Sequence, residues 1–101
     1  MAVELLFFEG CPSHPAALSE LRAAVAGRAE VVVREIVTEE EALAAGFPGS
    51  PTIRVDGVDL FPVDEPPSLS CRVYRLADGR FSPTPDPGEL RAALDRYFAR
   101  T

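Results

Sequence analysis

The strongest constraint on the fold lies in the first ten residues, where a short apolar run stops at a glycine. Residues 2–8 read AVELLFF, and Gly10 follows them. A nearly continuous apolar run of this length is typical of a strand buried on both faces, and it is short for a helix. The sequence therefore predicts a central β-strand over residues 3–8.

The segment after this run has the pattern of an amphipathic helix. Leu18, Leu21 and Val25 recur at spacings of three and four, and polar side chains stand between them. Gly27 follows as a stop signal. We expect a helix within residues 12–26.

Two further helices are indicated by their capping residues. Thr38, with Glu41 three positions later, forms a capping box that Gly46 closes. Asp86 is a preferred N-cap residue, and Glu89 stands at the third helical position after it. An apolar face follows this second cap, made of Leu90, Leu94, Tyr97 and Phe98. We expect one short helix after Thr38 and another after Asp86.

The remaining strands are marked by β-branched residues and by two Asp-Gly pairs. Residues 30–36 read EVVVREI, which favours a strand. Asp56-Gly57 separates the apolar residues 53–55 from 58–61, and Asp-Gly between apolar runs is a strong signal for a two-residue hairpin. A second Asp-Gly pair at residues 78–79 indicates another hairpin.

These elements follow one another as strand, helix, strand, helix, hairpin and helix. A right-handed crossover makes the first two strands parallel, and the hairpin completes a mixed sheet. We expect an α/β fold of order βαβαββα, with a mixed sheet of four or slightly more strands and flanking helices. The Pro-rich, acidic residues 62–85 form an insertion, and 101 residues suit one domain over residues 1–101.

The charge of the chain excludes several classes of partner. The formal net charge is -6 and no basic run is present, so the surface should repel nucleic acids and anionic lipids. The longest apolar stretch is too short to cross a bilayer, and the start of the chain lacks the pattern of a secretory signal. We expect a cytoplasmic protein with no nucleic-acid or membrane partner.

Cys11 lies where the first strand should meet the first helix, in the motif GCPSH. Free N–H groups and the helix dipole at such a junction stabilise a thiolate, and Pro12 is tolerated because its missing N–H has no helical acceptor there. We expect Cys11 to be more acidic and more reactive than an ordinary cysteine. Two readings stay open, a reactive thiol and an inert cysteine at a helix cap.

The chain resembles the thioredoxin-like superfamily in two motifs and in the order of its elements. GCPSH stands where that family has Cys-Pro-x-Cys, and GSPT precedes the hairpin where the family has a cis-proline. The resemblance covers nearly the whole chain. It implies a thioredoxin-like fold, thiol chemistry at Cys11, and a cis Pro51 whose neighbours Ser50 and Thr52 present their backbone to a substrate.

His14 departs from this family pattern, because it stands where the second cysteine would be. Imidazole forms no disulfide, so a conventional Cys-x-x-Cys cycle is excluded. On the same helix face as Cys11, His14 could hydrogen-bond the thiolate, accept its proton or bind a soft metal. It could also be an exposed residue with no special role.

Cys71 is the candidate replacement for the missing thiol. If its segment paired directly with residues 52–55, Cys71 would lie at the far end of that strand, roughly 16 Å from Pro51. The turn at Asp56-Gly57 instead returns the chain towards Pro51, which would let the two thiols meet. The alternative is a structural cysteine that packs as a small apolar residue.

The sequence favours a thiol-disulfide oxidoreductase whose nucleophile is Cys11, with His14 and Cys71 as further catalytic candidates and Cys71 as the resolving thiol. The substrate would be a protein or small-molecule thiol or disulfide, and no cofactor is implied. A second reading is a thioredoxin-like binding module without turnover, which binds a thiol ligand or holds a soft metal ion with Cys11, His14 and Cys71. A third is a scaffold whose site has decayed.

Overall fold

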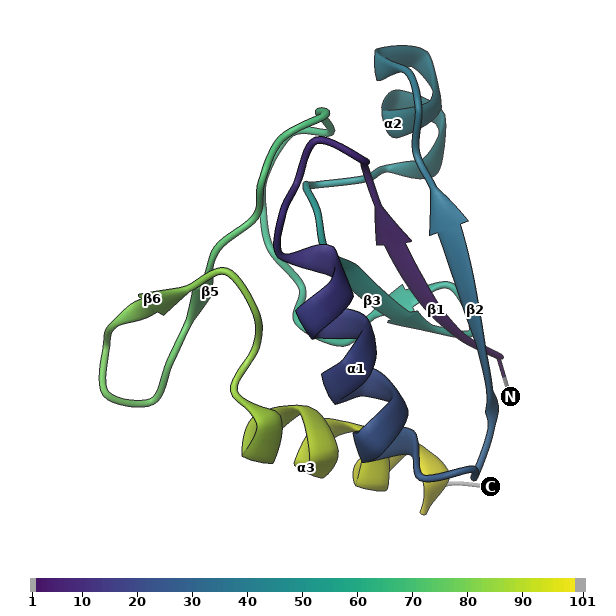
Figure 1. The fold of residues 1–101 in the computed structure, drawn as a ribbon, viewed down its shortest axis with the longest axis vertical. Coiled ribbons are helices and arrows are strands. Elements are labelled where there is room, and N and C mark those ends of the chain that lie inside the picture. The colour runs from purple at the N-terminus through teal and green to yellow at the C-terminus, as the bar shows by residue number, and fades with distance from the viewer. Residues whose placement is uncertain (1, 100–101) are drawn as a thin grey trace.

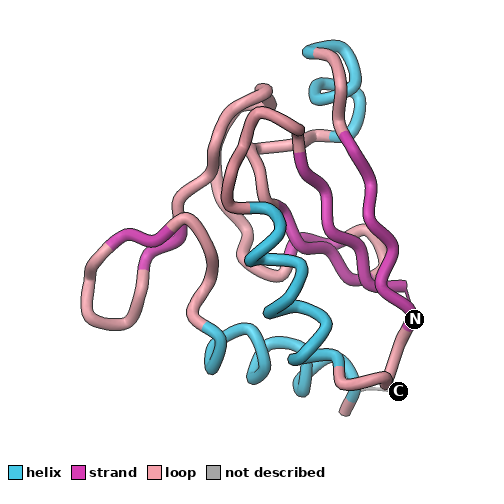
Figure 2. The backbone as a smooth tube through the Cα atoms, viewed as in Figure 1, coloured by secondary structure: helices cyan, strands magenta, loops and turns pink. Residues whose placement is uncertain are grey.

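The computed structural model describes residues 2–99, which form six strands and three helices (Figures 1 and 2). In chain order they are β1 (Ala2–Phe7), α1 (His14–Val25), β2 (Glu30–Glu35), α2 (Glu39–Ala45), β3 (Thr52–Val55), β4 (Val58–Asp59), β5 (Tyr74–Arg75), β6 (Phe81–Ser82) and α3 (Pro87–Phe98). The expected alternation of strands and helices is confirmed.

The main sheet is mixed and has four strands in the order β2-β1-β3-β4. β1 runs parallel to β2 and antiparallel to β3, so that Leu5 lies between Val33 and Ile53. β1 is therefore a central strand, as its apolar run predicts, although it ends at Phe7 rather than at residue 8. The α/β class and the mixed four-stranded sheet are confirmed.

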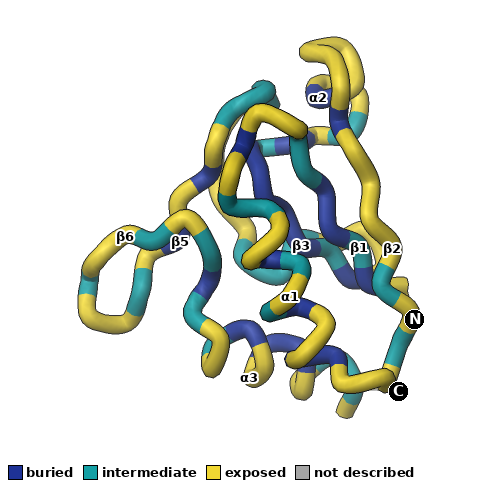
Figure 3. The backbone as a smooth tube through the Cα atoms, viewed as in Figure 1, coloured by how far each residue is buried: buried dark blue, intermediate teal, exposed yellow. Residues whose placement is uncertain are grey.

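The main core lies between one face of this sheet and the helices α1 and α3, which contact each other (Figure 1). Side chains two positions apart on a strand point to the same face, which places Val3 and Leu5 together against the helices. Leu6 points to the opposite face, where it packs with Ile36, Ala42 and Phe47. Figure 3 shows buried backbone along β1 and β3 and exposed backbone along most of β2. The members of the main core are Val3, Leu5, Ala17, Leu21, Ala24, Val25, Ile53, Val55, Leu90 and Leu94.

The capping residues act largely as the sequence predicts. The hydroxyl oxygen of Thr38 accepts a hydrogen bond from the Glu41 N–H at 3.1 Å, and the Asp86 carboxylate accepts one from the Glu89 N–H at 3.0 Å. The return bond of the capping box differs from expectation, because the Glu41 carboxylate accepts from the N–H of Val37 and not from that of Thr38. α2 and α3 begin directly after these caps.

Both predicted hairpins are present. Asp56 and Gly57 have φ values of 50° and 83°, the left-handed conformation that a two-residue hairpin turn requires, and they join β3 to β4. Asp78 lies in the longer turn between β5 and β6, which form a separate two-stranded sheet. Figure 1 shows this small sheet projecting from the body of the protein beside α1.

No helix in residues 2–99 combines the length and the apolar character needed to cross a membrane.

Candidate functional site

The site is built where residues 68–72, here called the strap, lie along the segment that leads into β3. The Ser68 N–H donates to the Phe47 carbonyl at 3.0 Å, and the Ser50 N–H donates to the Ser70 carbonyl at 2.8 Å. The Arg72 N–H donates back to the Ser50 carbonyl, also at 2.8 Å. These bonds make a parallel bridge in which Cys71 is the partner of Ser50. The returning turn at residues 56–57 therefore brings Cys71 back beside Pro51, as one of the two sequence interpretations anticipated.

Gly49 allows the strap to approach this closely. Its φ is 136°, which L side chains rarely adopt. A Cβ atom at this position would lie 3.0 Å from the Arg72 Cβ and 3.2 Å from the Ser70 carbonyl oxygen. The glycine of the GSPT motif is thus required by both its conformation and its contacts.

Arg72 fastens the end of the strap to the sheet. Its buried guanidinium forms an ion pair with Asp59 at 2.8 Å and donates to the Thr52 hydroxyl at 3.3 Å and to the Phe61 carbonyl. The guanidinium carbon lies 4.5 Å from the centre of the Tyr74 ring. A buried charge is costly unless it is paired and hydrogen-bonded. Both terminal nitrogens of Arg72 are hydrogen-bonded and one is ion-paired, whereas its buried Nε has no partner within residues 2–99.

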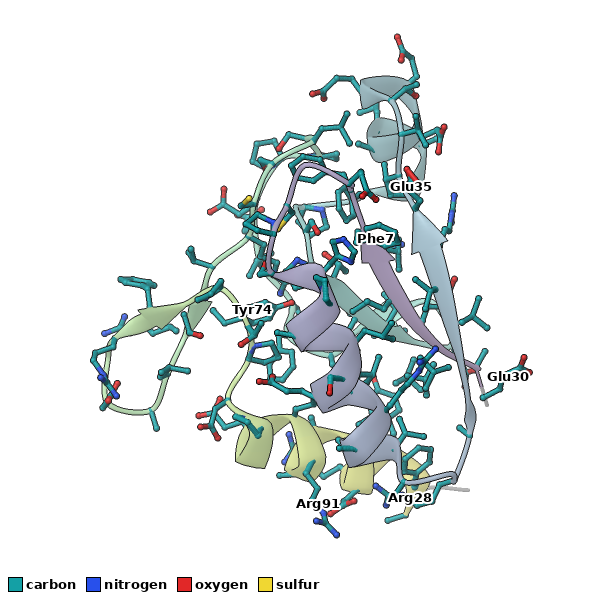
Figure 4. All side chains as sticks on the ribbon, in the orientation of Figure 1. Phe7, Arg28, Glu30, Glu35, Tyr74 and Arg91 are labelled. Atoms are coloured by element: carbon teal, nitrogen blue, oxygen red, sulfur yellow. The ribbon has the colours of Figure 1, made fainter. Side chains whose placement is uncertain are left out.

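Tyr74 makes a second connection between β5 and the start of β3. Its hydroxyl donates to the Pro51 carbonyl, and its side chain points inward from β5 (Figure 4). Burial raises the pKa of Tyr74, the charge of Arg72 opposes that rise, and the charge of Asp59 adds to it. Because its pKa is raised, the Tyr74 phenol stays neutral and keeps its hydrogen bond to the Pro51 carbonyl over the whole physiological pH range. The Ser50–Pro51 peptide bond is cis, as the GSPT motif predicts.

Helix α1 begins three residues after Cys11, so Cys11 is not its cap and the expected place of Cys11 at the end of the helix is corrected. The helix begins at His14 with Ser13 as its N-cap, and Pro15, not Pro12, occupies its first turn. The Cys11 N–H donates to the Phe8 carbonyl at 3.1 Å, so the chain makes a turn after β1 before the helix starts. The residue before a proline avoids helical geometry, so Pro12 disfavours a helix that begins at Cys11.

Hydrogen bonds rather than helix position stabilise a thiolate at Cys11. The Ser13 hydroxyl oxygen lies 3.0 Å from the Cys11 sulfur and can donate to a thiolate, whereas the neutral Cys11 thiol donates to the Ser50 carbonyl at 3.5 Å. Burial is the largest single influence and raises the pKa of Cys11. It is outweighed by hydrogen bonds from the Ser13 side chain and backbone, the Ser50 side chain and the Cys71 thiol. The pKa of Cys11 is therefore lowered, in the direction the sequence predicts but for a different reason.

The two thiols are near enough to shift each other's pKa. The pKa of Cys71 is raised, first by its hydrogen bond to Cys11, then by burial and by the charge of a Cys11 thiolate. Both cysteines are free thiols. Their exposure differs sharply, because Cys11 is 1 % exposed and Cys71 lies open to solvent. The sequence expectation that Cys11 is the more reactive thiol took no account of this burial.

Ser50 is the residue shared by both cysteines. Its backbone carbonyl contacts Cys11 and its backbone pairs with the strap at Cys71. Its hydroxyl is fully buried and has no hydrogen-bond partner of good geometry within residues 2–99. An unpaired buried hydroxyl is unfavourable, so it is available to donate to a thiolate at Cys11.

His14 takes a different place from the one that the helix-face argument gives it. Its imidazole stacks on the Phe7 ring at the end of β1, with ring centres 4.2 Å apart and an angle of 23° between the planes. Within the described chain it makes no hydrogen bond to Cys11. Figure 4 labels Phe7 at this end of β1.

No group of three or more His, Cys, Asp and Glu side chains within residues 2–99 is arranged to hold a metal ion, so Cys11, His14 and Cys71 do not form a metal site.

A pocket of about 280 Å³ opens beside Cys71. Its walls come from the strap, from Pro48 and from the Pro-rich insertion, including Val63 and Glu65. The sequence predicts substrate contacts from Ser50, Pro51 and Thr52, but all three are buried and none of them lines this pocket.

Sequence reasoning missed the residues that position the strap. Arg72 and Tyr74 stand two positions apart in an extended segment, so they share one face, and this spacing is the signal that could have identified them. Ser13 carries no such signal: it precedes α1 as its N-cap residue, but its side chain makes no cap hydrogen bond and instead contacts Cys11. Comparison of the chain with protein-family models, with curated proteins and with solved structures finds no match in any of the three.

Proposed function

We propose that this protein performs thiol-disulfide exchange with Cys11 and Cys71 as its redox pair. One observation carries the proposal. Both thiols meet at Ser50, where the Cys11 sulfur contacts the carbonyl and Cys71 is the backbone partner, and each thiol shifts the pKa of the other. These two free cysteines stand 60 positions apart in the sequence, and the fold brings both of them to the same residue.

The chemistry follows from the two ionisation states. A thiolate is the attacking species in disulfide exchange, and lowering the pKa of Cys11 increases the fraction of its thiolate below the pH at which an ordinary cysteine ionises. Reduction of an external disulfide RSSR forms the Cys11–Cys71 bond, breaks the R–S–S–R bond and yields two RSH. The two protein thiols supply both electrons and both protons.

The arrangement of the chain supports a thioredoxin-like architecture for this activity. The sheet order β2-β1-β3-β4, the cysteine after β1 and the proline before β3 agree with the resemblance in the motifs GCPSH and GSPT. Cys71 takes the part of the second thiol that His14 cannot play. In the reducing cytoplasm, where we place the protein, the pair would stay as a dithiol until a thiol or disulfide partner, protein or small molecule, reacts with it.

Counting thiols under mild oxidation tests the proposal. The wild type should lose both thiols while remaining monomeric, and its mass should fall by two hydrogen atoms. Peptide mapping should then join the peptides that contain Cys11 and Cys71, and dithiothreitol should restore both thiols. A His14→Phe variant serves as the control and should behave like the wild type. Two free thiols that persist in the monomer, or disulfide-linked dimers alone, would overturn the proposal.

A further inference from the structure

The two thiols of the proposed redox pair differ in how an external sulfur can reach them. Cys11 is 1 % exposed and is enclosed by Ser13, Ser50 and Cys71. Cys71 is exposed and stands in the wall of the 280 Å³ pocket. Disulfide exchange depends on which sulfur an external thiol or disulfide can approach. In this structure that sulfur is Cys71.

The electrostatic character of the pocket is negative. Glu65 lines it, and Asp64 is its neighbour in the acidic insertion. Neither carboxylate has an ion-pair partner within residues 2–99, whereas the one cation in the wall, Arg72, is already paired with Asp59. Glu39 adds another carboxylate at the strap, where it accepts from the Leu69 N–H at 3.4 Å. A cationic molecule entering the pocket would therefore be attracted, and an anionic one repelled.

From these observations, and resting on the proposed function, we infer that Cys71 is the sulfur that exchanges with external partners and that its pocket receives a small disulfide carrying positive charge. Cys11 is then the internal thiol that resolves the mixed disulfide. This assignment reverses the roles that the sequence motif suggests.

The reaction proceeds in two balanced steps. The Cys71 thiolate, after losing its proton to solvent, attacks one sulfur of RSSR, which forms Cys71–S–S–R and expels RS⁻. The Cys11 thiolate then attacks the Cys71 sulfur, forming the internal disulfide and expelling the second RS⁻. Both RS⁻ ions take protons from solvent, so the substrate gains two electrons and two protons. In the opposite direction an external thiolate attacks Cys71, and Cys11 leaves readily because its thiolate is stabilised.

Single-cysteine variants treated with cystamine, a small dicationic disulfide, test the assignment. Cys11→Ser should form a stable cysteamine adduct at Cys71, and Cys71→Ser should form one at Cys11 at least about tenfold more slowly, because the buried sulfur must first be uncovered. In the wild type, acid quenching at early times followed by peptide mapping should capture the adduct on Cys71, which needs no variant. A Cys11→Ala variant repeats the first measurement without a hydroxyl at that position.

The charge preference needs a matched set of disulfides. Cystamine, bis(2-hydroxyethyl) disulfide and dithiodipropionate differ mainly in charge, and each rate is divided by the rate of the same compound with free cysteine. At low salt, cystamine should exceed dithiodipropionate by at least about fivefold, and added salt should reduce that ratio. Glu65→Gln should lower the ratio, whereas Glu30→Gln should not, since Glu30 starts β2 away from the strap (Figure 4).

Each failure has its own signature. Faster adduct formation on Cys11 than on Cys71 would overturn the inference and leave the proposed redox pair intact. A normalised rate that is independent of charge would overturn the substrate class alone. If the wild type carried two separate cysteamine adducts and never formed the internal disulfide, the proposed function itself would be wrong.

Discussion

Ser50 and Cys71 are paired as neighbours in a parallel bridge, although 21 positions in the sequence separate them. The Ser50 N–H and carbonyl bond to the residues on either side of Cys71, at 2.8 Å each. The Ser50 carbonyl also contacts the Cys11 sulfur. Ser50, which lies just before β3, thus positions Cys71 through its backbone pairing and also contacts Cys11.

Replacing Gly49 should release the strap. In Gly49→Ala the new Cβ would meet Arg72 at 3.0 Å and would also be strained by a φ of 136°, so we expect a loss of about 2–4 kcal/mol in the free energy of unfolding and slower internal disulfide formation. Urea unfolding and thiol counting measure the two effects. Gly46→Ala is the control, because a Cβ there meets nothing within 4 Å and costs only the left-handed conformation, about 1–2 kcal/mol. Equal effects of both substitutions on disulfide formation would refute the contact argument.

The ion pair under the strap should matter far more than one at the surface. Asp59→Ala leaves the Arg72 guanidinium, only 3 % exposed, without its counter-charge, and should cost up to about 3–5 kcal/mol. Asp95→Ala removes an equally short pair with Arg28 whose partners are 37 % and 51 % exposed, and should cost about 0–1 kcal/mol. Urea denaturation of both variants gives the comparison. Similar losses would show that burial of Arg72 is not what makes its pair important.

Ionisation of the two thiols should occur in separate steps. Because the pKa of Cys11 is lowered and that of Cys71 is raised, thiolate absorbance should rise once below and once above the pH at which an ordinary cysteine ionises. Ser13→Ala should move the first step upward and leave helix α1 intact, since Ser13 makes no side-chain cap bond. The stabilisation that the Cys11 thiolate contributes is present above the pKa of the unfolded chain and is lost as pH falls through the lower folded value. A single step at the ordinary pH, unchanged by Ser13→Ala, would contradict this picture.

Tyr74 should make the protein sensitive to alkali. Its folded pKa is raised, so the stability that it contributes is fully present below the unfolded pKa of about 10 and is lost as pH rises above it. Tyr74→Phe removes the bond to the Pro51 carbonyl and should cost about 1–2 kcal/mol at neutral pH, and its stability should then fall less steeply in alkali. Unfolding curves from neutral pH to pH values above 10 would show whether the two slopes differ. Parallel curves would exclude Tyr74 as the source of the sensitivity.

His14 should contribute through its ring stack and not through proton transfer. His14→Phe keeps an aromatic ring on Phe7, so the rate of internal disulfide formation should stay within about twofold of the wild type. His14→Ala loses the stack and should lower the free energy of unfolding by about 0.5–1.5 kcal/mol. Stopped oxidation assays and urea unfolding separate the two effects. A tenfold slower reaction in His14→Phe would restore the imidazole as a participant.

Much of the secondary structure could be predicted because local signals determine it. Thr38 and Asp86 cap helices through bonds to residues three positions away, and Asp56-Gly57 adopts the turn that its own backbone preferences favour. The apolar run before Gly10 predicts a strand that is buried on both faces, and β1 has α1 and α3 against one face and the cluster of Ile36, Ala42 and Phe47 against the other. These residues needed no knowledge of distant parts of the chain.

The site was decided by the tertiary structure. Whether Cys71 meets Cys11 depends on the path of residues 62–70, which carry no periodic pattern, and on the approach of the strap to Gly49 and Ser50. The burial of Cys11 is likewise a property of the assembled strap and not of the GCPSH motif. A sequence motif identifies a thiol near a helix, but the relative exposure of two thiols depends on long-range packing, in which contacts between distant residues outweigh local preference.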